Sequence, residues 1–162
     1  MSGMIHIITG NGPGKTTRAL GLALRSVGRG LQVKFIMFMK GQETGELFSS
    51  PFAIEQYGSS SFVFEPSDEH RANASKALKA ALRAVKKEGI VIVDEVFDAL
   101  TAELVTVDEI IELISSKSDD VELILTGRYA PKELYDLADY VTEIQCVKHP
   151  YPVSLARVGI EY

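Results

Sequence analysis

The stretch ITGNGPGKTT, residues 8–17, decides the fold of this chain. It follows the phosphate-loop pattern G-x-x-x-x-G-K-[ST] at Gly14, Lys15 and Thr16, but Thr9 stands where the first glycine is expected. An apolar run ends at Thr9 and a helical pattern begins near Gly14. In this order of strand, loop and helix, backbone N–H groups point at a polyphosphate and the helix N-terminus adds favourable potential. The stretch therefore predicts a nucleotide-binding loop of a variant form.

Strand-like and helical patterns alternate along the whole chain, which favours a parallel sheet with crossover helices. The apolar, β-rich runs predict strands at 4–9, 32–39, 54–58, 89–94, 121–126, 140–147 and 156–162. Helical spacing predicts helices over 19–27 and 74–85, a third from the capping box of Thr106 and Glu109, and a fourth with Pro131 in its first turn. We expect a single domain, residues 1–162, with a three-layer α/β fold and a mostly parallel sheet of the P-loop NTPase, RecA-like kind.

The composition excludes several functions. The formal net charge of -5 gives no electrostatic reason to bind nucleic acid, and no apolar run approaches the ~20 residues of a membrane-spanning helix. The start of the sequence lacks the pattern of a secretory signal, so a cytoplasmic location is expected. Cys146 is the only cysteine, which excludes a zinc site built from cysteines of one chain.

The second half of a nucleotide site is an acid at the end of a neighbouring strand. The run IVIVDEVF supplies it as Asp94 and Glu95. In P-loop enzymes such an acid holds Mg²⁺ together with the hydroxyl of the loop, here Thr16. Arg128, in LTGR, follows another strand, at the edge where ligands of open α/β sheets bind. The sequence allows two roles for this arginine: a contact with phosphate or base, or a surface salt bridge.

Seven motifs together resemble one family. They are TGNGPGKTT, FMKG (38–41), VDE (93–95), LTGR (125–128), LADYVTEI (137–144), VKHPY (147–151) and GIEY (159–162). In this order, from about residue 4 to residue 162, they are similar to the ATP:corrinoid adenosyltransferases of the P-loop type. The most specific of them are the loop itself and the ending from VKHPY to GIEY.

The resemblance implies a particular reaction. In that family a cobalt(I) corrinoid attacks the 5′ carbon of ATP and expels triphosphate, and the nucleotide is bound in the reverse sense to ordinary P-loop ATPases. The chain is therefore expected to transfer the 5′-deoxyadenosyl group of ATP to cob(I)alamin or a related corrinoid, with Mg²⁺ as cofactor. An altered loop at Thr9 fits an altered register of the nucleotide. No protein nucleophile is required, because the main task is to stabilise the leaving triphosphate.

The resemblance also carries roles onto individual residues. ATP binding falls on Gly10, Asn11, Gly12, Gly14, Lys15, Thr16, Thr17, Arg25, Glu95 and Arg128. The candidate catalytic groups are Lys15 and Thr16, and the candidate metal ligands are Thr16, Asp94 and Glu95. Corrinoid binding falls on Phe62, Phe64 and His149. The two phenylalanines match the family's aromatic segment, which keeps the lower axial ligand off the cobalt and ends in Trp, whereas this chain has no Trp. Packing into the core is the alternative role for both. A homodimer and a reductase partner are further expectations from the family.

Two other functions compete with the transferase. A nucleoside kinase-like phosphotransferase also has an acidic pair at a strand end, but such kinases usually carry a cysteine zinc site that one cysteine cannot form. A non-catalytic, ATP-dependent corrinoid-binding protein would bind ATP without turnover. The products formed from ATP discriminate among the three.

Overall fold

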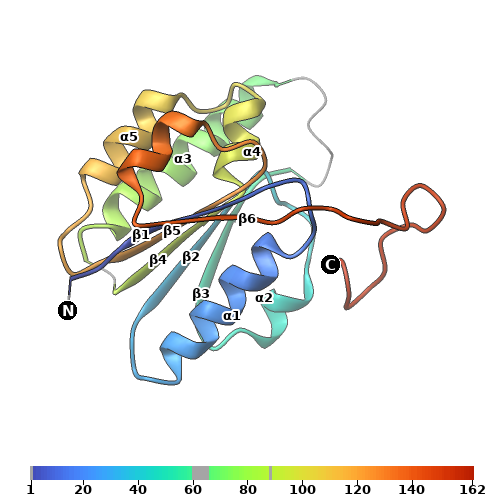
Figure 1. Ribbon diagram of the computed structural model, residues 1–162, viewed down its shortest axis with the longest axis horizontal. Coiled ribbons are helices and arrows are strands. Elements are labelled where there is room, and N and C mark those ends of the chain that lie inside the picture. The colour runs from blue at the N-terminus through green and yellow to red at the C-terminus, as the bar shows by residue number, and fades with distance from the viewer. Residues whose placement is uncertain (1, 60–65, 88) are drawn as a thin grey trace.

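The computed structural model describes residues 2–59, 66–87 and 89–162, and in these residues six strands form one sheet in the order β3-β2-β4-β5-β1-β6 (Figure 1). All the paired strands run parallel. The strands are β1 (Ile5–Thr9), β2 (Val33–Phe38), β3 (Ala53–Tyr57), β4 (Ile90–Asp94), β5 (Glu122–Thr126) and β6 (Tyr140–Glu143). The helices are α1 (Lys15–Val27), α2 (Gly45–Ser49), α3 (Asp68–Ala84), α4 (Val96–Thr101), α5 (Val107–Ser115) and the 3-10 helix η1 (Lys132–Leu137).

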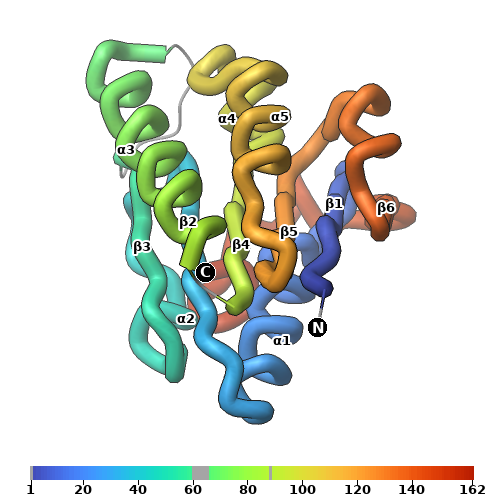
Figure 2. The backbone as a smooth tube through the Cα atoms, turned by 90° about the vertical axis from the view of Figure 1, so that its left-hand side faces the viewer, coloured from blue at the N-terminus to red at the C-terminus, as the bar shows by residue number. Residues whose placement is uncertain are grey.

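Helices cover both faces of the sheet. Figures 1 and 2 show α1 and α2 on one face and α3, α4 and α5 on the other. The predicted three-layer α/β fold is therefore confirmed. Strand β5 lies between β1, which leads into the phosphate loop, and β4, which ends in the acidic pair. The phosphate loop and the acidic pair therefore both stand at the carboxyl edge of the sheet, with one strand between them.

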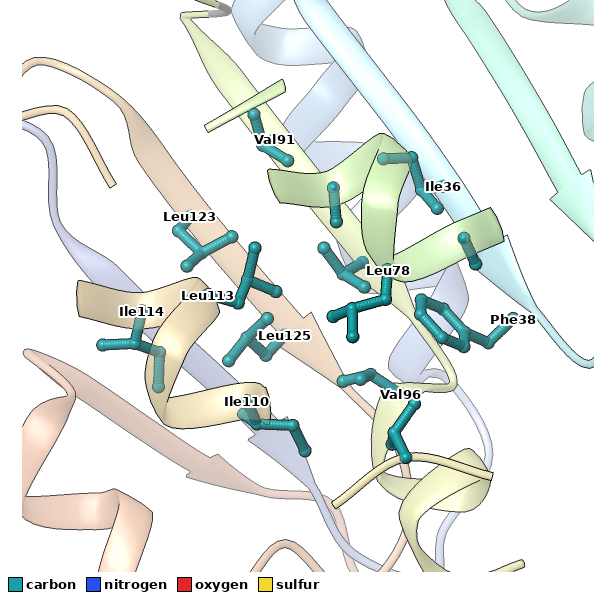
Figure 3. Packing of buried hydrophobic residues seen from close by; sticks show 14 of the residues in the cluster. Ile36, Phe38, Leu78, Val91, Val96, Ile110, Leu113, Ile114, Leu123 and Leu125 are labelled. Atoms are coloured by element: carbon teal, nitrogen blue, oxygen red, sulfur yellow. The ribbon is translucent and has the colours of Figure 1, made fainter. Parts of the chain in front are cut away.

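The core follows from the period of two along each strand. On β4, Val91 and Val93 belong to the cluster under α3 and α5, whereas Ile90 and Ile92 belong to the cluster under α1. Figure 3 shows Leu78 of α3 beside Phe38 of β2 in the first cluster. Both faces of the central strands are thus buried, as expected for a parallel sheet between two helix layers. This packing holds the carboxyl ends of β1 and β4 in fixed positions.

Some predicted elements differ from the structure at the C-terminal end. Strand β6 ends at Glu143, four residues earlier than predicted. In the described part of the chain it is an edge strand that pairs with β1, and this pairing stops at Thr9 opposite Glu143. The strand predicted at 156–162 is wrong, since residues 158–161 form a turn and the others have no regular secondary structure. The element at Pro131 is a short 3-10 helix.

Helices α2 and α4 were not predicted, because five or six residues are too few to display a helical period.

The C-terminal segment, residues 145–162, extends away from the sheet (Figure 1). Several of its apolar side chains are almost fully exposed, with Val147 at 95% and Val153 at 96%. Among the helices of the described residues, none has the length and apolar character needed to cross a membrane.

Candidate nucleotide-binding site

The phosphate loop joins β1 to α1 and is shaped by glycines. Gly10 has φ 106° and Gly14 has φ 107°, in the region that favours glycine. Lys15 opens helix α1, and its ammonium donates to the carbonyl oxygens of Gly10 and Gly12, each at 2.8 Å. Burial lowers the pKa of Lys15, and the nearby Arg128 cation lowers it further. The Lys15 side chain is therefore folded back over the phosphate loop and held there by its backbone carbonyl groups.

The end of β6 lies directly against the loop. A Cβ at Gly10 would come within 2.3 Å of the Ile144 carbonyl oxygen, and one at Gly12 within 2.8 Å of the Gln145 backbone. The N–H of Gly12 donates to that same Ile144 oxygen at 2.8 Å. The Asn11 side chain accepts from the N–H of Cys146 at 2.9 Å. Glycines are thus required here by close backbone approach, and the segment after β6 clamps the loop.

A half-open cleft of about 350 Å³ lies beside the start of the loop. It is lined by Thr9, Gly10, Asn11, Tyr129, Tyr135, Glu143, Gln145 and Cys146. The loop is therefore reached from solvent between the segment after β5 and the end of β6.

Thr9, the residue in place of the first glycine, is the last residue of β1 and is 3% exposed. Its hydroxyl accepts a hydrogen bond from the backbone N–H of Ala130 at 3.0 Å. The sharp turn out of the strand is made by Gly10, so Thr9 does not need the conformations of a glycine. Threonine at this position therefore ties the phosphate loop to the segment that carries Arg128.

Asp94, at the end of β4, is fully buried and is held from several sides. Its carboxylate accepts from the Thr126 hydroxyl at 2.6 Å and from the Thr16 hydroxyl at 3.0 and 3.2 Å. The ammonium of Lys40, which follows β2, lies 3.2 Å from Oδ2 of the same carboxylate. The phosphate loop, the acidic strand and the segment after β2 thus meet at one carboxylate.

Glu95 follows in a left-handed conformation, with φ 61°. Its N–H donates to the Thr126 hydroxyl at 3.0 Å, and its carboxylate lies 3.4 Å from the Lys40 ammonium. Burial raises the pKa of Glu95 to about 7; Lys40 acts in the opposite direction, and Asp94 adds to the rise. For Lys40, burial opposes the charged form, but Asp94 and Glu95 outweigh it and raise its pKa. A backbone strained at such a point is typical of functional sites.

Arg128 lies in the segment after β5, on the same edge of the sheet. Its backbone N–H donates to the Asp98 carboxylate at 3.0 Å. Burial raises the pKa of Asp98, and Arg128 partly offsets that effect. The Arg128 side chain itself is exposed. The structure thus places an exposed cation close enough to Lys15 to affect its charge.

Other residues named from the sequence lie apart from this cluster. Arg25 is exposed in the last turn of α1, ten residues after Lys15 and so about 15 Å away along the helix axis. His149 is exposed in the C-terminal segment, where its ring accepts from the N–H of Tyr151 at 3.1 Å. Phe62 and Phe64 lie outside the described residues. Within one chain the structure does not bring Arg25 to the phosphate loop.

Three residues of the cluster were not assigned a role from the sequence: Lys40, Thr126 and Asp98. Lys40 is part of the FMKG motif and Thr126 is part of LTGR, so their motifs were visible but their contacts were not. Both stand at or just after the carboxyl end of a predicted strand. That placement is the signal that would have named them, because carboxyl ends of parallel strands meet at one edge.

The residues present fit a magnesium ion bound together with phosphate. Mg²⁺ in such sites takes only one or two protein ligands, and the remaining positions are filled by water and substrate phosphates. The Thr16 hydroxyl and the Asp94 carboxylate are in contact. The Lys40 ammonium, 3.3 Å from the hydroxyl and 3.2 Å from the carboxylate, already places a positive charge beside them. Among the described residues no group of three or more His, Cys, Asp or Glu is arranged to hold a metal.

The fold and this cluster define a P-loop nucleotide-binding protein of the three-layer α/β class. A solved structure with the same fold is the flagellar accessory protein FlaH from Methanocaldococcus jannaschii, with a TM-score of 0.61 and 15% identity over 88% of this chain and 71% of that chain. At that identity the likeness shows the fold alone.

The sequence comparisons are more specific. The profile of the family described as ATP:corrinoid adenosyltransferase BtuR/CobO/CobP matches residues 1–162. The corrinoid adenosyltransferase CobA of Salmonella typhimurium is 32% identical, and that of Escherichia coli K12 is 30% identical; each match covers 99% of this chain and 86% of the relative. An uncharacterised protein of Nostoc sp. is 32% identical, and there the chain spans about half, 48%, of the relative's length.

The chain therefore belongs to the ATP:corrinoid adenosyltransferase family, as the resemblance predicted. This is a family of enzymes, and ATP-dependent adenosylation of corrinoids is the activity its name states. The kinase-like and non-catalytic alternatives are not favoured by these matches.

Proposed function

We propose that this protein transfers the 5′-deoxyadenosyl group of ATP to the cobalt of a cob(I) corrinoid and releases triphosphate. The observation that carries the proposal is the contact between Thr16 and Asp94, 3.0 Å at its shortest, in a chain of this family. It joins the phosphate loop to the acidic strand, so one cluster of residues is able to hold a polyphosphate and its counter-cation.

In the proposed reaction the cobalt(I) centre of the substrate supplies an electron pair to the 5′ carbon of ATP. The carbon–oxygen bond breaks, and its electron pair leaves with the triphosphate. The residues of the chain bind and orient the triphosphate and stabilise the charge that develops on it. The loop N–H groups and Lys15 carry out this role, because donors already aimed at that position need no reorganisation during the reaction.

Thr16 and Asp94 are the proposed ligands of Mg²⁺, and Glu95 is a third candidate at the edge of the same cluster. When bound, the ion neutralises charge on the phosphate oxygens. The buried Thr126 hydroxyl, 2.6 Å from Asp94, keeps that carboxylate in one orientation. Arg128 and Arg25 remain proposed nucleotide contacts. For Arg25, whose position in one chain is remote from the loop, the contact would have to come from a rearrangement or a second subunit.

The corrinoid side of the site is proposed from the sequence. Phe62 and Phe64 would exclude the lower axial ligand so that the cobalt is more easily reduced, and His149 would contact the corrin. Support comes from the family membership alone. A reductant that supplies cobalt(I) is the proposed protein partner, and we propose that the enzyme acts in the cytoplasm.

A homodimer is the proposed assembly. Support comes from the C-terminal segment, where Val147, Val153 and Leu155 are 95%, 96% and 79% exposed. Exposed apolar side chains gathered in one segment are typical of surfaces that a partner covers. Sedimentation equilibrium on the full chain tests this proposal, and a monomer at all concentrations would overturn it.

The test of the reaction is anaerobic incubation of the protein with MgATP and chemically reduced cob(I)alamin. The cobalt spectrum reports the product, and chromatography identifies the phosphate released. We expect adenosylcobalamin together with intact triphosphate. Formation of ADP would favour a phosphotransferase, and ATP bound without change would favour a binding protein. Lys15→Ala serves as the inactive control, and Lys79→Ala, on the exposed face of α3, as the matched surface control.

A further inference from the structure

The ammonium of Lys40 lies where the proposed metal ligands converge. Its Nζ is 3.2 Å from an Asp94 oxygen, 3.3 Å from the Thr16 hydroxyl and 3.4 Å from a Glu95 oxygen. The Lys40 side chain is only 22% exposed, and that of Asp94 is fully buried. A lysine therefore makes the contacts that a metal ion bound to these groups would make.

The fold holds Lys40 in this place from its backbone outward. Strand β2 pairs directly with β4, with Met37 opposite Asp94, so the residues that follow β2 lie beside the acids. Met39 is in the left-handed region, with φ 57°, so the backbone leaves the extended conformation of β2 just before Lys40. A Cβ at Gly58 would come within 2.3 Å of the Met39 carbonyl carbon and 2.4 Å of the Lys40 backbone nitrogen. The segment after β3 therefore packs tightly on this turn. The position of the ammonium is therefore built into the fold.

The charges explain why a cation is needed there. Asp94 is fully buried and the adjacent Glu95 is partly buried, and like charges repel more strongly there than in bulk water. Lys40 offsets that repulsion when no other cation is present. A divalent ion needs the same oxygens, and an ammonium and a metal ion cannot both occupy them. Whichever cation is bound thus excludes the other.

We propose that Lys40 is a positioning residue that holds Asp94 and Glu95 in the metal-free protein and gives way to the metal only when nucleotide phosphates bind. The inference rests on the proposed metal site at Thr16 and Asp94. Phosphate oxygens add ligands for the metal, and they place negative charge beside the displaced Lys40 ammonium. Replacement of the ammonium by the metal therefore becomes favourable when nucleotide is bound. Lys40 thereby makes metal binding dependent on nucleotide, which keeps the acids in place without trapping a metal ion in the empty enzyme.

The test measures binding of Mn²⁺, a paramagnetic substitute for Mg²⁺, by the electron paramagnetic resonance signal of the free ion. Wild-type protein, Lys40→Met and Lys40→Arg are titrated with Mn²⁺ in the absence of nucleotide. We expect Lys40→Met to bind Mn²⁺ at least tenfold more tightly than wild type, because the competing cation is gone. Lys40→Arg keeps the positive charge and should remain close to wild type. Lys40→Gln repeats the experiment with a polar side chain, and circular dichroism verifies that each variant is folded.

The outcomes separate this inference from the function on which it rests. A role in packing alone would lower the melting temperature of Lys40→Met and leave its Mn²⁺ affinity unchanged, and an unchanged affinity overturns the inference. Adding Asp94→Asn to Lys40→Met should abolish the gain; a gain that persists would place the ion elsewhere and also overturn it. Wild type that, with ATP, binds Mn²⁺ beyond the amount bound by the same concentration of ATP alone sustains the metal site whatever Lys40 does. Wild type that binds no Mn²⁺ even with ATP removes the metal site and the inference together.

Discussion

The hydroxyl of Thr9 accepts a hydrogen bond from the backbone N–H of Ala130 at 3.0 Å, and both residues are buried. This contact explains why threonine stands where the phosphate-loop pattern has a glycine. The strand β1 runs through Thr9, and the left-handed turn comes one residue later at Gly10. The side chain at position 9 is thus available to fasten the segment after β5, which carries Arg128.

Replacement of Thr9 by valine should destabilise the protein. Valine has the shape of threonine but no acceptor, so the buried N–H of Ala130 loses its partner at a cost of about 1–3 kcal/mol. Urea unfolding of Thr9→Val and wild type measures the difference in free energy. Thr9→Ser retains the hydroxyl and should lose less. Equal stability of the valine variant and wild type would mean that water or another group satisfies Ala130.

Replacement of Lys15 by alanine should slow adenosyl transfer on the order of 10²-fold or more, as for other preorganised groups that stabilise developing charge. The ammonium donates to the carbonyl oxygens of Gly10 and Gly12, so it lies within the phosphate loop. Single-turnover formation of adenosylcobalamin measures the rate constant. Lys79→Ala should react at the wild-type rate. Near-normal turnover in Lys15→Ala would show that the triphosphate is held elsewhere.

Replacement of Thr126 by valine should destabilise the acidic cluster. The hydroxyl donates to Asp94 at 2.6 Å and accepts from the Glu95 N–H at 3.0 Å, so its loss leaves two poorly solvated groups with one partner fewer. The expected loss is about 2 kcal/mol in the free energy of unfolding. Chemical denaturation in the absence of nucleotide measures it. Thr126→Ser should recover most of the loss; if serine and valine are equally destabilising, shape and not hydrogen bonding is the cause.

The pKa of Glu95, raised to about 7 by burial, predicts how stability depends on pH. The unfolded chain releases this proton near 4.5, whereas the folded protein keeps it until about pH 7. The free energy of unfolding should therefore fall as the pH rises from about 4.5 to 7 and level off above that range. Glu95→Gln lacks this titrating group. Between pH 5 and pH 8 the free energy of unfolding of Glu95→Gln should therefore rise relative to that of wild type by roughly 1–3 kcal/mol.

Unfolding curves of wild type and Glu95→Gln at pH 5, 6, 7 and 8, in chelator and without nucleotide, measure this difference. A constant difference between the two proteins across the range would contradict the raised pKa. Asp120→Asn, at an exposed carboxylate before β5, is the matched control and should follow wild type at each pH.

Much of the fold was predictable because it depends on local patterns. The strand, glycine loop and helix around Lys15 stand in sequence as they do in the structure, and the six strands of the described sheet fall within one residue of their predicted starts. The predicted strand at 156–162 failed because a strand needs a neighbour, and the C-terminal segment has left the sheet at that point. Propensity alone does not supply that neighbour.

By itself the sequence determined the class of the protein, since the phosphate loop, the acidic strand end and the family motifs are all local. Only the tertiary structure decided which side chains meet. Lys40 and Asp94 are 54 residues apart, and their contact depends on β2 lying next to β4 in the sheet. Thr9 and Ala130 likewise meet because β1 lies beside β5. Strand order follows from how the whole chain packs its apolar faces, and no stretch of residues around either partner contains that information.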